Sequence, residues 1–422
     1  MEIKNISEIE YENFIKEYTD ILFFQSVEWA KFKSKTNWDM EIIGLFEGEN
    51  LKAASILLSQ KLPFIKRKMY YCPRGFVIDY SNYDLIKEYT TYLKNYLKSK
   101  KAIFLKINPY VEYQKRDKDG NIIEKDTNKP LIDYFKKLGY KHYGFYIEFN
   151  KKKDLEPRWL SVLNLENKSV DELVKNMRQT TRWMINKSQK NCITISEAVY
   201  DDLPKYKELM KHTAERRNFI DRPLSYYQTM YDCLNETGMF KLLLAHIDLE
   251  RLKMQVKDDI NRLQSRIDIV QNNPKKENQV LEFNNQIKSL NHQLNDIEEK
   301  EKSHGSNPLI AAGLYLSYGD QVVYLFGGSY KEFMSYGAQY LMQYEMIKFA
   351  KDNGYKKLNF YGIDGDFRRE GLHYGLFDFK RGFNSDVVEL IGEFDLVVNR
   401  FYYALYNIMF GTYKLIKKVR KK

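Results

Sequence analysis

Heptad repeats in the middle of the chain constrain its fold more than any other feature. Apolar residues recur at spacings of four and three, which is typical of the inward stripe of a coiled-coil helix: Val256, Ile260, Leu263, Ile267 and Val270. After Asn272-Asn273-Pro274, where a helix cannot continue, a second stripe follows at Val280, Phe283, Ile287, Leu290, Leu294 and Ile297. Residues 247–304 are therefore predicted to form a solvated antiparallel coiled-coil arm, about 35 Å long at ~1.5 Å per residue.

The arm interrupts a pattern that occurs twice in the chain. Apolar segments predicted as strands flank the arm at 240–247 and 309–316, and a similar pair, 40–46 and 51–58, flanks a short turn near the N-terminus. In both copies there follow an aromatic strand with a glycine loop (70–75; 324–328), a helix (83–99; 334–352) and another strand (102–107; 357–361). This order resembles the acetyltransferase fold. We expect an α/β (α+β) protein of two tandem acetyltransferase-like (GNAT-like) subdomains.

The predicted domains follow from this pattern. The first subdomain spans residues 1–150, and the second spans 151–246 and 305–395. The arm at 247–304 is inserted in the second subdomain, and an aromatic and basic tail occupies 396–422.

Composition favours an anionic partner and no metal. The chain has 68 Lys and Arg against 57 Asp and Glu, a net charge of +11, which favours nucleic acid, anionic lipid or a phosphorylated substrate. Biased codon usage is an open alternative explanation. The three cysteines and six histidines are scattered without paired spacing, so we expect neither a disulfide framework nor a metal site.

Two features bear on localisation. The N-terminus carries no signal peptide and no apolar run reaches the ~20 residues of a membrane span, which predicts a cytoplasmic protein. The tail pairs an aromatic segment, 401–410, with six later Lys and Arg residues. Two interpretations stay open: peripheral binding to the inner membrane face, or a terminal helix packed on its own domain.

Basic residues suggest contacts to phosphate. In a predicted helix over 169–190, Lys175, Arg178 and Arg182 recur at three and four residues and form one cationic edge suited to a tRNA backbone. A solvated helix face is the alternative. Arg222 precedes Pro223 in extended or turn backbone, where its guanidinium either projects toward a phosphate or forms a loop salt bridge.

The glycine loop of the second repeat argues against acetyl-CoA. Acetyl-CoA enzymes hold the diphosphate with a Gln/Arg-x-x-Gly-x-Gly/Ala signature at the start of a helix. Here the stretch is Phe326-Gly327-Gly328-Ser329-Tyr330. An acetyl-CoA cofactor is therefore disfavoured.

Several motifs in one order resemble the FemABX family of peptidyltransferases, which move amino acids from aminoacyl-tRNA to the stem peptide of a cell-wall precursor. The likeness covers nearly the whole chain and includes the arm of the FemA-like members. Its motifs are Gln25–Lys31, Arg74-Gly75, Ile107-Asn108-Pro109, Asp221-Arg222-Pro223 with Tyr226, Tyr324-x-Phe326-Gly327-Gly328, Asn359-Phe360-Tyr361-Gly362 and Phe377-Asp378-Phe379-Lys380.

The resemblance implies roles for particular residues. Lys31 and Arg222 match the residues that hold the precursor's diphosphate, with Tyr226 nearby, and Lys380, after Phe379, matches the lysine that stabilises the oxyanion. Such an ammonium contributes ~3–4 kcal/mol, although Lys380 in an acidic and basic segment also fits a surface ion pair.

Two further positions belong to the predicted substrate-binding set. Tyr324 lies in the glycine-loop motif, and Asn108 stands where many family members carry Asp. Because an amide does not accept a proton at neutral pH, an enzyme base at position 108 is in doubt.

The predicted function is transfer of Gly, Ala or Ser from aminoacyl-tRNA, a co-substrate, to the stem-peptide side-chain amine of a lipid-linked or nucleotide-linked muropeptide. No other cofactor is expected. Two rivals are an acetyl-CoA-dependent N-acetyltransferase and a non-catalytic adaptor that binds tRNA or protein. A homo- or hetero-oligomer with related transferases is a further expectation.

Overall fold

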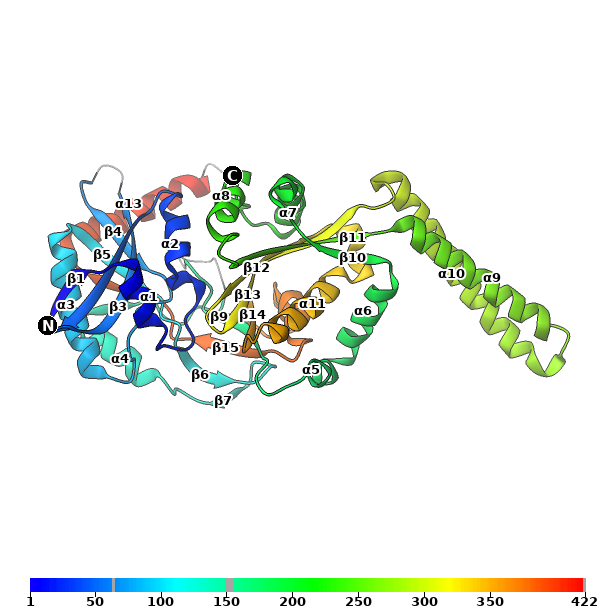
Figure 1. The fold of residues 1–422 in the computed structure, drawn as a ribbon, viewed down its shortest axis with the longest axis horizontal. Helices are drawn as coiled ribbons and strands as arrows, with labels where there is room; N and C mark the ends of the chain where they lie inside the picture. The colour runs from blue at the N-terminus through cyan, green and yellow to red at the C-terminus, as the bar shows by residue number, and fades with distance from the viewer. Residues whose placement is uncertain (63–64, 149–154, 420–422) are drawn as a thin grey trace.

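The chain folds around two twisted β-sheets, from which a helical arm projects (Figure 1). This computed structural model describes residues 1–62, 65–148 and 155–419, with side chains up to residue 409. Four short 3₁₀ turns join larger elements: η1 (Phe23–Gln25), η2 (Tyr200–Asp202), η3 (Pro274–Lys276) and η4 (Lys331–Tyr336).

The first sheet is built mainly from the N-terminal part of the chain. Its strands, in spatial order, are β1 (Glu2–Asn5), β2 (Asp39–Glu47), β3 (Asn50–Lys61), β4 (Lys68–Cys72), β5 (Ala102–Ile107), β16 (Phe394–Val397) and β8 (Tyr140–His142). The accompanying helices are α1 (Glu8–Ile15), α2 (Val27–Ser34), α3 (Tyr83–Ser99) and α4 (Lys129–Lys137). Residues of α3 and α4 are buried with the sheet in one apolar core.

The second sheet carries helices on both faces (Figure 1). Its order is β10 (Ile193–Glu197), β11 (Phe240–Ile247), β12 (Leu309–Tyr318), β13 (Gln321–Ser329), β14 (Lys357–Ile363), β9 (Trp159–Asn164), β15 (Asp386–Leu390), β6 (Glu112–Arg116) and β7 (Ile122–Glu124). One face packs against α7 (Leu203–Arg217) and α8 (Leu224–Leu234). The other packs against α5 (Val170–Asn176), α6 (Gln179–Lys190), α11 (Ala338–Asp352) and α12 (Tyr374–Arg381).

The predicted duplication is confirmed by strand pairing. Strands β2 to β5 pair antiparallel, antiparallel and then parallel, with α3 as the crossover helix, and β11 to β14 repeat this with α11. The copies differ at the parallel pair. In the second copy, β13 and β14 pair only at Gln321–Val323 and then separate, which opens the sheet near Tyr361 and Gly362.

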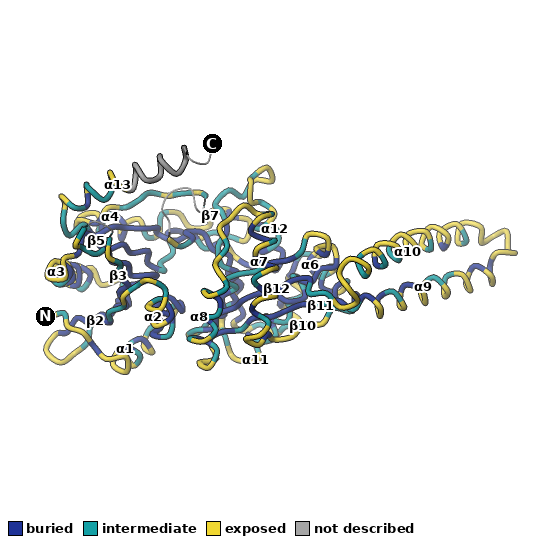
Figure 2. The backbone as a smooth tube through the Cα atoms, turned by 90° about the horizontal axis from the view of Figure 1, so that it is seen from above, coloured by how far each residue is buried: buried dark blue, intermediate teal, exposed yellow. Residues whose placement is uncertain are grey.

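The arm consists of α9 (Leu249–Val270) and α10 (Glu277–His304), antiparallel to each other (Figures 1 and 2). Near its tip, Ile267, Val270 and Phe283 form a small core of their own. At its base, Leu252 and Ile297 are buried in the core of the second subdomain. The arm is thus continuous with the sheet that carries it.

One local prediction differs from the structure, and the two sheets exchange strands. The segment 112–124 supplies β6 and β7 to the second sheet, while β16 returns to the first. The predicted helix over 169–190 is wrong as one helix, because Met177 is buried in extended backbone and separates α5 from α6. The N–H of Arg178 instead donates to the Gly382 carbonyl at 2.9 Å.

The C-terminal helix α13 (Arg400–Val419) lies against the first sheet. Tyr403 and Tyr406 pack on Phe104 of β5, with ring centroids 5.4 and 5.1 Å apart. Across the described part of the chain, no helix is long and apolar enough to cross a bilayer.

Candidate active site

Two unpaired cations meet where the subdomains touch. Helix α2 of the first packs against α8 of the second, and Lys33 Nζ lies 6.0 Å from the ring centroid of Tyr226. The Arg222 guanidinium lies 5.2 Å from the same centroid. Within the described residues neither cation has a carboxylate within ion-pair distance. Burial lowers the pKa of Lys33; Glu156 opposes this effect and Arg222 adds to it. An anion between these cations would relieve their repulsion.

The structure places Lys31 elsewhere. Its Nζ lies 2.6 Å from Glu8 Oε2 in an exposed ion pair. Since residues two apart on a helix point roughly 200° from each other, Lys31 and Lys33 do not share a face. Lys33, not Lys31, reaches the cluster of Arg222 and Tyr226. Both lysines lie in α2, which begins after the N-cap Ser26.

The loop that carries Arg222 is held by its neighbour. Asp221 pairs with Lys207 and accepts hydrogen bonds from the Tyr227 hydroxyl at 2.9 Å and from the Arg222 N–H at 2.7 Å. Asp221 is therefore engaged, and the exposed Arg222 guanidinium forms no loop salt bridge of the kind considered above. Burial raises the pKa of Tyr226 to about 12, so its hydroxyl stays protonated and able to donate.

Asn108 is used inside the protein. Its Oδ1 accepts from the Arg74 N–H at 2.9 Å, and its Nδ2 donates to the Tyr71 hydroxyl at 3.0 Å. It is 2 % exposed. Asn108 thus holds the loop after β4 in place rather than presenting a free amide.

Lys380 is a buried cation of the second subdomain. It lies in the last turn of α12, is 4 % exposed, and its Nζ donates to the Gly362 carbonyl at 2.6 Å. Burial lowers its pKa to about 7, and no ion pair to it occurs in the described residues. Its predecessor Phe379 packs edge-on against Tyr340 of α11, with centroids 4.9 Å apart. Lys380 is therefore buried and is no surface ion pair.

Helix α12 is fixed by an ion pair from α6. Arg178 Nη1 lies 3.0 Å from Asp378 Oδ2, and Asp378 also pairs with Arg381. Arg182 donates to the carbonyls of Lys175 and Met177, at 2.6 and 2.8 Å, across the break between α5 and α6. Two of the three residues predicted to contact tRNA thus make internal contacts, and Lys175 is exposed.

Tyr324 lies beside the opening between β13 and β14. Its hydroxyl donates to Gln339 Oε1 at 2.9 Å near the start of α11, and its ring stacks on Tyr315 with centroids 5.0 Å apart. Gln339 in turn donates to the Gly328 carbonyl at 2.7 Å. Tyr324 therefore supports the glycine loop from the α11 face.

The dipeptide Tyr361-Gly362 connects Lys380 with Glu156, the carboxylate near Lys33. Tyr361, in left-handed backbone with φ of 66°, donates its hydroxyl to Glu156, while the adjacent Gly362 carbonyl accepts from Lys380. Glu156 belongs to no recognisable sequence motif. Lys33 lies in the same helix as Lys31, and only Lys31 belongs to the family motif.

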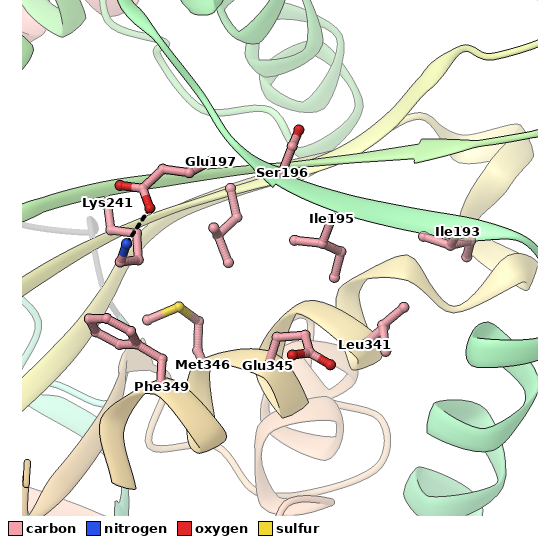
Figure 3. Close-up of a pocket in the computed structure, with 10 residues that line it drawn as sticks. Ile193, Ile195, Ser196, Glu197, Lys241, Leu341, Glu345, Met346 and Phe349 are labelled. Atoms are coloured by element: carbon pink, nitrogen blue, oxygen red, sulfur yellow. Dashed lines mark hydrogen bonds and ion pairs between the residues drawn. The ribbon is translucent and has the colours of Figure 1, made fainter. Parts of the chain in front are cut away.

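A groove in the second subdomain lies away from these residues. This groove of ≈ 360 Å³ runs between the β10 edge and α11 and includes Ile195, Lys241 and Phe349 (Figure 3). None of the predicted site residues lines it. A cavity of ≈ 10 Å³ lies beside Glu156 and Asn108, about the room for one water. The described residues contain no cluster of three potential metal ligands.

Known proteins resemble this chain over nearly its whole length. The FemAB family profile matches residues 6–410. Aminoacyltransferase FemA of Staphylococcus epidermidis is 29% identical over 427 residues, covering 100% of both chains. Lipid II:glycine glycyltransferase of Staphylococcus aureus is 30% identical over 413 residues, covering 96% of this chain and 95% of that one.

Solved structures show the same architecture. The crystal structure of FemX superposes with a TM-score of 0.74 at 29% identity, covering 96% of this chain and 99% of that chain. A tandem GNAT protein from the clavulanic acid pathway gives a TM-score of 0.51 at 7% identity, covering 94% and 98%, and shares the fold alone.

Proposed function

This chain belongs to the FemAB family of aminoacyltransferases, and on that premise we propose that it transfers an amino acid from aminoacyl-tRNA to a peptidoglycan precursor, lipid II or a related muropeptide. The acceptor is the side-chain amine of the third stem-peptide residue, so that the product begins or extends an interpeptide bridge. Gly, Ala and Ser are the candidate amino acids. The glycyltransferase named among the relatives supports this choice.

The buried charge of Lys380 is the observation that carries this proposal. A lysine in an apolar site without a carboxylate loses much of its hydration, and proteins retain such groups mainly where function requires them. Attack of an amine on the tRNA ester places negative charge on the former carbonyl oxygen. Lys380, which already points a hydrogen atom at a carbonyl oxygen of β14, supplies a fixed cation for that charge.

Lys33 and Arg222 are proposed to hold the precursor's diphosphate. Their positions on opposite subdomains let one dianion contact both, with Tyr226 between them. The acceptor amine would then reach the acyl ester through the separation of β13 and β14, where Tyr361 and Gly362 join the two halves of the site.

Three finer proposals concern partners. An exposed Trp183 on α6, with Lys187 Nζ 5.0 Å from its ring, suits stacking by a base of tRNA. The basic residues beyond 413 support contact with an anionic membrane face. Exposed Met254, Ile269 and Leu281 on the arm support association with a second, related chain.

A purified-component assay tests the function. The protein is incubated with lipid II and tRNA charged with labelled Gly, Ala or Ser, and the label in the lipid fraction is measured. We expect transfer from at least one charged tRNA and no heat of binding when CoA is titrated. Absence of transfer from every charged tRNA refutes the proposal. In that case, binding of CoA would favour the acetyltransferase, and no binding of CoA would favour an adaptor.

A further inference from the structure

Glu156 is a carboxylate that the reaction described above leaves unused. It lies just before β9, where the two subdomains meet, and accepts a hydrogen bond from the Tyr361 hydroxyl. Its loop is held on two sides. Arg74 Nη2 donates to the Pro157 carbonyl at 2.7 Å, and a Cβ at Gly362 would lie 3.0 Å from the Pro157 side chain. Glycine at 362 thus permits close approach of the loop to β14.

The charges around Glu156 suit an ammonium ligand together with a diphosphate. Electrostatic interactions or hydrogen bonds connect its carboxyl with six side chains: Arg74, Lys33, Tyr361, Glu393, Tyr71 and Tyr226. Burial raises the pKa of Glu156 above its ordinary value, with Glu393 adding to the rise and Arg74 opposing it. A zwitterionic ligand, with its diphosphate on Lys33 and Arg222 and its ammonium on Glu156, would match this alternation of charge.

Other carboxylates nearby are already engaged. Glu393 Oε2 lies 3.2 Å from Lys106 Nζ, and its Oε1 accepts from the Leu155 N–H at 2.8 Å. Glu389 pairs with Arg116 and Arg158. Asn108 is an amide and is hydrogen-bonded to Arg74 and Tyr71. In the described structure, Glu156 is therefore the carboxylate beside Lys33 that has no ion pair of its own.

We propose that Glu156 binds the acceptor ammonium of the precursor and accepts its proton before attack. This inference rests on the proposed function. The ammonium gives one proton to the Glu156 carboxylate, and the freed lone pair forms the C–N bond to the ester carbon. The C–O bond to the tRNA ribose then breaks, a second proton of the attacking nitrogen goes to the ribose oxygen, and Glu156 returns its proton to water.

The test compares Glu156→Gln with a matched control in the full-length protein. Glutamine keeps an oxygen that accepts from Tyr361 but binds no proton. Glu41→Gln is the control, because Glu41 is likewise a partly buried carboxylate that accepts from two tyrosine hydroxyls, Tyr70 at 2.9 Å and Tyr96 at 2.7 Å, in the first subdomain. Turnover is measured at saturating lipid II and aminoacyl-tRNA between pH 6 and 9.

We expect Glu156→Gln to lower turnover at pH 7 by about 10²-fold or more. The ratio of wild-type to variant turnover should shrink as pH rises, because the acceptor amine then deprotonates without help. Glu41→Gln should retain wild-type turnover. A variant Glu156→Gln with turnover within threefold of wild type, or with a constant deficit at all pH values, would overturn the inference.

A binding measurement separates ammonium recognition from a structural role. Wild type should bind lipid II more tightly than an analogue whose third stem residue is norleucine, and Glu156→Gln should lose that preference. An equal preference in both proteins contradicts the ammonium contact. If wild type shows no transfer at all, the proposed function fails; if wild type transfers normally and Glu156→Gln matches it, only this inference fails.

Discussion

Replacing Lys380 with methionine should make the protein more stable and nearly inactive. Methionine keeps most of the buried apolar volume and removes the ammonium. In the folded chain, burial holds the pKa of Lys380 at about 7, against an ordinary value of 10.5. Below pH 7 the folded state therefore carries the whole free-energy cost of a buried charge. This cost disappears as the pH rises toward the pKa of Lys380 in the unfolded chain.

The magnitude follows from that difference. At ~1.36 kcal/mol per pKa unit, the cost at pH 7 is roughly 4 kcal/mol, an upper limit because the Gly362 carbonyl loses its donor in the variant. The free energy of unfolding should rise by up to this amount, and the gain should fade between pH 7 and 10. Turnover should fall about 10²–10³-fold, the effect of one lost oxyanion donor.

Chemical denaturation at several pH values and single-turnover transfer to lipid II provide the two measurements. Lipid II affinity should change less than threefold, since Lys33 and Arg222 are intact. A destabilised variant would refute the uncompensated burial of Lys380, and turnover within tenfold of wild type would refute its oxyanion role.

Four further outcomes are expected. Lys33→Met should raise the KM for lipid II about 10–100-fold, because a charged contact is lost. Lys31→Met should leave this KM within twofold, because the ion pair that Lys31 forms with Glu8 is exposed. Wild-type kcat/KM should fall as pH rises through about 7, because the Lys380 ammonium in the free enzyme deprotonates there. Arg178→Gln should lower turnover about tenfold without changing lipid II affinity, because it removes the ion pair with Asp378 that holds α12 in place. Trp183→Ala should raise the KM for aminoacyl-tRNA about tenfold and leave the KM for lipid II unchanged.

Most of the fold was predictable from the local spacing of apolar residues. The heptads of the arm and the apolar strands on either side of it are patterns of neighbouring residues, and the structure contains each of them in the expected order. The crossing of β6, β7 and β16 between sheets was not predictable in this way, because it depends on pairing between residues far apart in sequence. Met177 shows the same limit: burial of one side chain broke a helix that its neighbours favoured.

For the candidate site, the sequence singled out helices, whereas the position of each side chain depends on the fold. Both Lys31 and Lys33 lie in α2, and only packing against α8 shows which one faces Tyr226. Lys380 was identified through its family motif, but its burial depends on the fold of α12 against β14. Glu156 has no sequence signal, since the role proposed for it depends on Tyr361 and Lys33, which lie more than a hundred residues away on either side.

The most direct test of the account is the position of the new amide bond. Lipid II carrying ¹⁵N at the side-chain amine of the third stem residue is incubated with the protein and its charged tRNA, and the product is fragmented by mass spectrometry. The account predicts one added amino acid whose carbonyl is bonded to ¹⁵N. An adduct on any other nitrogen or oxygen, or no adduct with any charged tRNA, would contradict it.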